Sequence, residues 1–178
     1  MSTAAPTTPS QATMSPKQQF LDTYQSGIEK TLRVLRAYPK DKTELKPHPK
    51  AKSARDLAFM FVAEQGAMTK TLTTGFDWSK PMQFPPTPET LDEVIAAFED
   101  GNRKVVELVQ SAPEEKILGE TIQFPVGPGK MGDVPKMQAL WMFLCDQIHH
   151  RGQFSVYLRM ADGKVPSIYG PSLDEPWR

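Results

Sequence analysis

The segment ALWMFLCDQIHHRGQFSVYLR, residues 139–159, decides the fold class of this 178-residue chain. It is apolar on nearly every side from Ala139 to Cys145, which is typical of a helix that enters a protein core. We expect a helix over about residues 136–161, ended by Asp162 and Gly163, with its first half deeply buried. Its second half carries two of the three histidines of the chain, His149 and His150.

Three earlier segments also repeat apolar residues at helical spacing. Each begins with residues that are typical of a helix N-terminus. These are Ser15 before Pro16 for the first helix, Ser53 for the second, and Thr87 before Pro88 for the third. Four amphipathic helices without convincing strands predict an all-α protein, a four-helix bundle.

The connections between these helices, about 13, 14 and 24 residues, are long for a bundle and leave room for a crossover topology. Residues 112–135 form the longest of them. Its stretch KILGETIQFPVG is compatible with extended backbone, but we expect no sheet. The aromatic loop TTGFDWSKPMQFPP is expected to pack over the end of the bundle. The composition of residues 1–14 predicts a disordered tail. Residues 15–178 are expected to form a single domain, and the irregular C-terminal segment should dock on it.

Composition limits the function classes. Lys and Arg number 21, as do Asp and Glu, so the formal charge is zero and a nucleic-acid surface is not expected. No apolar run approaches the roughly 20 residues that span a bilayer, and no targeting segment is recognisable, so we expect a cytoplasmic protein without a membrane partner. The single cysteine, Cys145, excludes an intrachain disulfide and is expected to be a small buried hydrophobe.

The histidine pair has metal-ligand spacing with the residues one turn earlier. Asp146 lies four residues before His150, and Cys145 lies four residues before His149. Two ligands at this spacing on one helix can hold zinc, nickel or iron when a facing helix supplies a third. Because neighbouring residues point about 100° apart on a helix, both histidines cannot be central to one site.

Glu64 is the one acidic residue on the apolar face of the second helix. A carboxylate there needs a partner. Arg151, His150 or a metal ion could each supply it.

The motif HHRGQFSVYLR, followed by VPSIYGP and DEPW, resembles the DinB superfamily, the DinB/YfiT-like metalloenzymes. The stretch KAKSARDLAFMFVAE is similar to the second helix of that family. The resemblance implies a four-helix bundle of up-down-down-up topology and a homodimer. Relatives of assigned activity include S-transferases that use bacillithiol, mycothiol or glutathione, and a mycothiol-dependent maleylpyruvate isomerase.

The family's metal site uses three histidines, one on the second helix and two spaced four apart on the last. In this chain the first position falls on Met60 or Phe61, neither a usual metal ligand. The last-helix pair corresponds to Asp146 and His150 or, in a register shifted by one, to Cys145 and His149. The site is therefore degraded, or rebuilt around Asp146, His150 and Glu64.

Two functions follow as hypotheses. The first is a metal-dependent hydrolase or transferase, specifically a metal-assisted thiol-dependent S-transferase. It would use a divalent zinc, nickel or iron ion and a low-molecular-weight thiol. The metal-ligand candidates are His150, Asp146, Glu64 and His149. The catalytic candidate is His150, which without the metal would have to act alone as a general base. The alternative is a metal-free protein that binds a small ligand or serves only dimerisation. The sequence does not identify the substrate.

Overall fold

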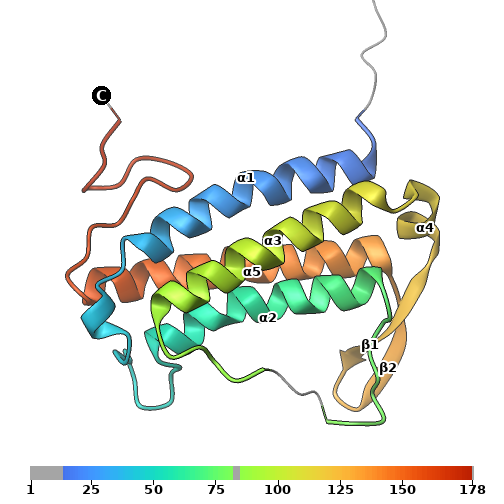
Figure 1. The fold of residues 1–178 in the computed structure, drawn as a ribbon, viewed down its shortest axis with the longest axis horizontal. Helices are drawn as coiled ribbons and strands as arrows, with labels where there is room; N and C mark the ends of the chain where they lie inside the picture. Colours follow the sequence, from blue (N-terminus) through green and yellow to red (C-terminus); the bar gives the residue numbers. More distant parts are fainter. Residues whose placement is uncertain (1–13, 82–84, 178) are drawn as a thin grey trace, which may run out of the picture.

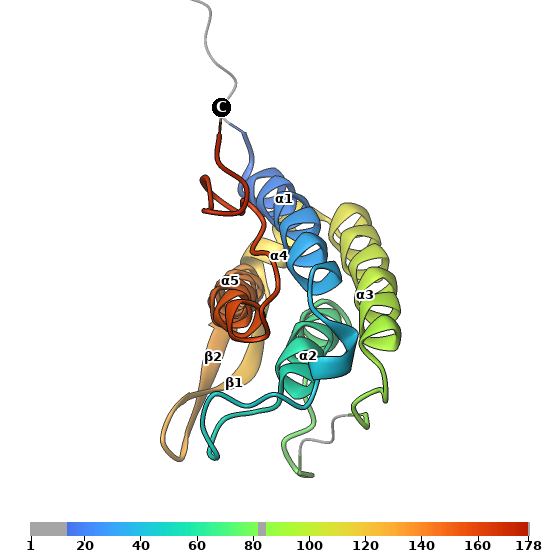
Figure 2. The same ribbon diagram turned by 90° about the vertical axis from the view of Figure 1, so that its left-hand side faces the viewer.

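The structure, a computed structural model, describes residues 14–81 and 85–177. Four long helices lie side by side in Figures 1 and 2: α1 (Pro16–Arg36), α2 (Ala54–Leu72), α3 (Leu91–Ser111) and α5 (Lys136–Met160). Helices α1 and α2 each contact both α3 and α5. A 3-10 turn, η1 (Lys40–Lys42), and a short helix, α4 (Glu114–Gly119), lie in the connections. The predicted mostly helical architecture is confirmed, whereas the predicted disordered tail falls outside the described residues except for Met14.

Two of the predicted helix starts are confirmed in detail, and the third is wrong by three residues. The Ser15 hydroxyl accepts from a first-turn backbone N–H of α1, and the Ser53 hydroxyl does the same for α2. Helix α3 begins at Leu91 and not at Pro88. Thr90 and Glu93 form a capping box, in which each side chain accepts the backbone N–H of the other. This pair satisfies two otherwise free N–H groups, which Thr87 with Pro88 cannot do.

The connection after α3 contains a sheet, which corrects the all-helical prediction. Strands β1 (Thr121–Gly127) and β2 (Lys130–Pro135) pair antiparallel, with Ile122 opposite Val134. Gly129 lies in the turn with φ of +66°, a conformation that glycine adopts without steric cost. A hairpin of two strands is marginal alone, so its stability depends on packing against the helices.

An aromatic group ties this hairpin to the rest of the molecule. Phe124 of β1 lies edge-on to Phe143 of α5, with ring centroids 5.7 Å apart. Phe76 and Trp78, from the loop after α2, also pack on Phe124, and the Trp78 indole donates to the Gln123 carbonyl at 2.7 Å. The expected packing of the aromatic loop is confirmed for these two residues, while its third aromatic, Phe84, lies outside the described residues.

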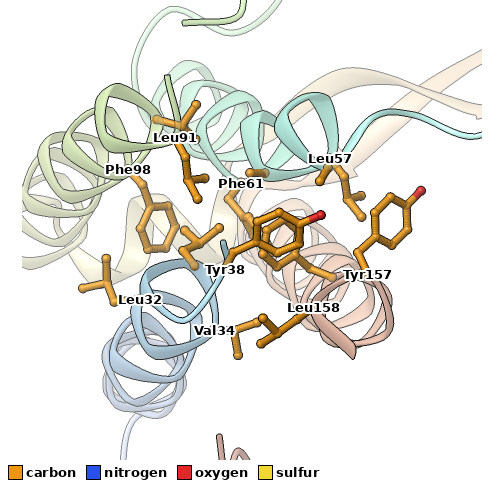
Figure 3. Packing of buried hydrophobic residues seen from close by; sticks show 14 of the residues in the cluster. Leu32, Val34, Tyr38, Leu57, Phe61, Leu91, Phe98, Tyr157 and Leu158 are labelled. Atoms are coloured by element: carbon orange, nitrogen blue, oxygen red, sulfur yellow. The ribbon is translucent and has the colours of Figure 1, made fainter. Parts of the chain in front are cut away.

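The core is divided into two apolar clusters along the helices. One cluster surrounds Tyr38 and Phe61 and is drawn in Figure 3; the other surrounds Phe20 and Leu140. On each long helix, buried polar residues lie at positions between the two clusters: Thr31 on α1, Glu64 and Gln65 on α2, Asn102 on α3, Gln147 and Arg151 on α5. We call this set the polar layer. Burying polar groups in a core costs stability unless they are paired, so the layer marks the part of the bundle where function is to be sought.

One side of α5 remains exposed, contrary to the prediction that its first half is deeply buried. Met142 is 42% exposed, and Cys145 is exposed as well. Val156 and Met160 continue the same side at 57% and 48% exposure. The neighbours α1 and α2 cover only the opposite side of α5, so an apolar sequence alone did not determine burial here.

The segment after α5 docks as expected. Val165 and Ile168 pack against the cluster around Tyr38, and Asp174 accepts the backbone N–H of Val165 at 2.8 Å. In the described part of the chain, no helix combines the length and the apolar character needed to cross a bilayer.

Candidate metal centre

Three of the predicted ligands come together between α2 and α5. Glu64 lies on α2, while Asp146 and His150 lie one turn apart on α5. One ligand atom from each lies within 4.8 Å of the other two. Glu64 is buried, His150 is half-buried and Asp146 is exposed, so the group is closed on its α2 side and open on its α5 side.

The centre of the group is a hydrogen bond between Glu64 and His150. Glu64 Oε1 lies 2.5 Å from His150 Nδ1. Burial raises the pKa of the Glu64 carboxyl from 4.5 to about 7, although the bond to His150 acts in the opposite direction. The same bond raises the pKa of His150. Both groups therefore hold protons to higher pH than usual, and a proton shared between them neutralises a buried pair.

The remaining candidates lie outside this group. His149 is exposed, and its ring centroid is 5.5 Å from that of His150. Cys145 is exposed, which corrects its expected burial. Of the three partners considered for Glu64, the structure provides His150 and not Arg151, whose guanidinium bonds to the α1 residues Gly27 and Thr31.

The position where the family resemblance expects a histidine on α2 is occupied by apolar side chains. Phe61 is fully buried, and its ring stands edge-on to His150 at 6.4 Å between centroids. Met60, one residue earlier, is half-buried. Glu64 lies one turn after Met60 and brings a carboxylate, instead of an imidazole, to the group formed with Asp146 and His150.

The donors fit a divalent metal ion. Two carboxylates and one imidazole form a set that suits zinc, iron or nickel, with room for further ligands on the exposed side. Glu64 Oε2 is buried without a hydrogen-bond partner among the described residues, so one carboxylate oxygen remains available to a cation. A tetrahedral ion at about 2.1 Å from both ligands would need Oε1 and Nδ1 about 3.4 Å apart. Binding through this pair of atoms therefore requires them to separate from 2.5 Å and the shared proton to leave.

Sequence reasoning missed the polar residues behind the site. The Tyr24 hydroxyl donates to Asn102 Oδ1 at 2.7 Å, and Gln65 Nε2 donates to the Phe98 carbonyl at 3.0 Å. Gln147 is buried on α5 one residue after Asp146. The sequence signal for them was an amide residue near the middle of an apolar helix face, as at Gln65, Asn102 and Gln147. The spacing of apolar residues, on which the helices were predicted, gives such residues no weight.

Comparisons with known proteins agree with this architecture. The DinB family profile matches residues 10–177. The chain is 29% identical over 120 residues to the uncharacterized protein YrdA of Bacillus subtilis strain 168, an alignment that covers 67% of each chain.

Two solved structures share the fold. A DinB-like protein from Bacillus cereus ATCC 10987 gives a TM-score of 0.70 at 23% identity, covering 84% of this chain and 95% of its own. The DinB-like protein YjoA from Bacillus subtilis gives 0.63 at 17% identity, covering 89% and 99%. Since the family profile extends over almost the whole sequence, the chain belongs to the DinB family.

Proposed function

We propose that this protein is a divalent-metal-dependent enzyme of the DinB family, in which His150 retains one of the three histidines expected from the family resemblance and Glu64 and Asp146 replace the other two. The carrying observation is the convergence of their ligand atoms within 4.8 Å, from two helices that are far apart in sequence. The reaction class we propose is transfer to or from the sulfur of a low-molecular-weight thiol.

The three residues have different tasks in this proposal. Glu64 and His150 form the buried half of the centre and fix its position between α2 and α5. Asp146 completes it from the exposed side, where a thiol and its reaction partner can approach. A bound divalent ion would lower the pKa of a coordinated thiol, which supplies the thiolate nucleophile at neutral pH.

A metal-free function is the second candidate, and the short bond between Glu64 and His150 favours it. This pair is already satisfied without an ion, apart from Glu64 Oε2. In that case the pair serves as an acid–base couple or only as a structural contact, and the protein binds a small ligand or a second copy of itself.

Metal titration separates the two candidates. The chelator-treated protein is titrated with Zn²⁺, Ni²⁺ or Fe²⁺, with bound metal measured by mass spectrometry and stability by thermal melting. We expect one ion per chain and a raised melting temperature, with affinity increasing with pH because the ligands must release their protons. Asp146→Asn should weaken binding at least about tenfold.

His149→Gln is the matched control, since it removes an exposed imidazole next to the centre. It should leave the affinity unchanged. Less than stoichiometric metal in the wild type, or equal binding by the Asp146→Asn variant, would eliminate the metal-dependent candidate and leave the metal-free one.

We also propose that the chain forms a homodimer through the exposed side of α5. Met142, Val156 and Met160 provide the apolar surface for it. Val156→Glu should shift the protein to monomer in sedimentation analysis, and a monomeric wild type would contradict this.

The direction of the four long helices supports the up-down-down-up topology of the family. The colours of Figure 1 show that α1 and α5 run one way and that α2 and α3 run the other.

A further inference from the structure

Arg151 is a buried cation whose partners are all neutral. Its side chain is 2% exposed, and Nη1 donates to the Gly27 carbonyl and the Thr31 hydroxyl, each at 2.9 Å. Nη2 donates to the Tyr169 hydroxyl. Nε has no partner among the described residues, and no carboxylate there forms an ion pair with the guanidinium.

This arrangement is costly without an anion. A guanidinium stays protonated in proteins, and an uncompensated buried charge costs several kcal/mol. Since Glu64 pairs with His150 instead, the required negative charge must come from another source.

A cavity lies beside Arg151. Its volume is about 330 Å³, and it lies between α1, α5 and the C-terminal segment. Its lining residues include Gly27 and Lys30 of α1, Leu144, Ile148 and Arg151 of α5, and Tyr169. This size is at the lower end of the range for small-molecule pockets.

The cavity is separate from the candidate metal centre. His150 and Arg151 are neighbours in sequence, but their side chains leave α5 about 100° apart. His150 therefore meets α2, whereas Arg151 meets α1. The end-on view of Figure 2 shows α1 and α2 on different sides of α5.

The charges around the cavity favour an anion. Lys30 Nζ lies 5.5 Å from the centre of the Tyr169 ring and donates to the Ser26 carbonyl at 2.9 Å, with no carboxylate partner in the described ranges. Asp22 is the one acidic residue of the lining, and its carboxylate accepts from Gln18 at 2.6 Å. Two cations thus face one exposed acid that already has a partner.

The rest of the wall selects the kind of anion. Leu144 and Ile148 offer aliphatic surface, and Tyr169 offers an aromatic ring. An inorganic ion would leave this surface uncovered, whereas an organic acid would bury it.

We propose that the cavity binds a small organic acid, with its carboxylate at Arg151 and Lys30 and its apolar body against Leu144 and Ile148. The carboxylate replaces the Tyr169 hydroxyl as the acceptor of Arg151 Nη2. Because Tyr169 is 63% exposed and belongs to the irregular C-terminal segment, its ring can turn aside to admit the ligand. This site does not depend on a metal ion.

The test uses benzoate as the probe, added to the full chain in the presence of a chelator and followed by amide NMR shifts. We expect saturable binding with a dissociation constant of about 1 mM or tighter, and shifts centred on Gly27 and Arg151. Benzamide, which has the same shape without the charge, should bind at least about tenfold more weakly. Inorganic phosphate tests whether charge alone is sufficient.

Variants locate the binding without disturbing the buried arginine. Ile148→Trp fills the cavity from its partly exposed rim and should abolish saturable binding. Lys30→Gln should weaken it about threefold to tenfold, while Lys46→Gln, an equal charge change in an exposed loop, should have no effect.

Three results would overturn the proposal. These are no saturation by benzoate, equal binding of benzoate and benzamide, or unchanged binding to the Ile148→Trp variant. Binding of phosphate but not benzoate would likewise reject an organic acid. None of these results bears on the metal centre, because the chelator is present throughout.

Discussion

Replacing Glu64 by Gln should make the metal-free protein more stable at neutral and alkaline pH. The pKa of Glu64 is raised by burial from 4.5 to about 7. Between these two values, the unfolded chain releases its proton before the folded chain does. The free energy of unfolding therefore falls as the pH rises from about 4.5, and the loss is complete above about 7.

The size of the effect follows from the shift. Each pKa unit corresponds to about 1.4 kcal/mol, so ionising Glu64 costs the folded state about 3 kcal/mol. The pKa of His150 is raised by the same contact, so its stabilising contribution is present below about pH 6.5 and also declines as the pH rises. Glutamine has the shape of the protonated acid and does not titrate, so the variant loses both parts of this dependence.

Urea denaturation followed by circular dichroism, at several pH values from 5 to 8 with a chelator present, measures the effect. Near pH 5 the Glu64→Gln variant should be no more stable than the wild type, because it lacks the contribution of the protonated His150, and at pH 8 it should be more stable by up to about 3 kcal/mol. The difference between the two proteins cancels the titration of the other carboxylates. A difference that does not change with pH would refute the assigned environment of Glu64.

Three substitutions test the packing around the site by denaturant unfolding. Phe61→Ala removes a fully buried ring of α2 that packs against Phe98 of α3 and His150 of α5. It should lower the free energy of unfolding by about 3–5 kcal/mol, and a loss below about 1 kcal/mol would contradict this packing. Thr90→Ala should cost about 1 kcal/mol through loss of the capping box, whereas Thr87→Ala should change stability by less than about 0.5 kcal/mol. A larger loss for Thr87→Ala than for Thr90→Ala would instead support a helix that starts at Pro88. Tyr24→Phe should cost about 1–2 kcal/mol, because it removes the buried hydrogen bond to Asn102, and no loss would show that bond to be unimportant.

The helices were predictable from sequence because their signals are local. Ser15 and Ser53 cap their helices where the apolar spacing begins, and the last helix was placed to within a residue of its observed bounds. The start of α3 was misplaced because Thr87–Pro88 and Thr90–Glu93 both have local N-terminal character. The choice between the two starts depends on the reciprocal hydrogen bonds of Thr90 and Glu93, and residue spacing alone does not show which of the two pairs forms such bonds.

The hairpin could not be predicted in the same way. Its strands are short and contain two prolines, Pro125 and Pro135, and two glycines, so their propensity is low. They are held by a non-local contact, the packing of Phe124 against Phe143 and against the loop after α2. Such contacts become visible only when the helices are placed in space.

The candidate site was predictable in part. Helical spacing brought Asp146 together with His150, and the position of Glu64 on an apolar face required a partner. Spacing did not decide between His149 and His150, because that depends on how α5 is rotated against α2. Nor did it predict that Arg151, one residue further, turns to α1 and borders a cavity.

The polar layer explains why both proposed sites lie at the middle of the bundle. A four-helix bundle filled with apolar side chains at this level would be more stable, because Glu64, Gln65, Asn102, Gln147 and Arg151 each bury a polar atom without a partner among the described residues. The two ionisable groups of the layer with unpaired atoms lie on different sides of α5. The Glu64 carboxylate lies on the side that faces α2, and the Arg151 guanidinium lies on the side that faces α1. Their separation leaves one side suited to a cation and the other to an anion, which is the arrangement expected when ligands, and not the fold, complete the charges.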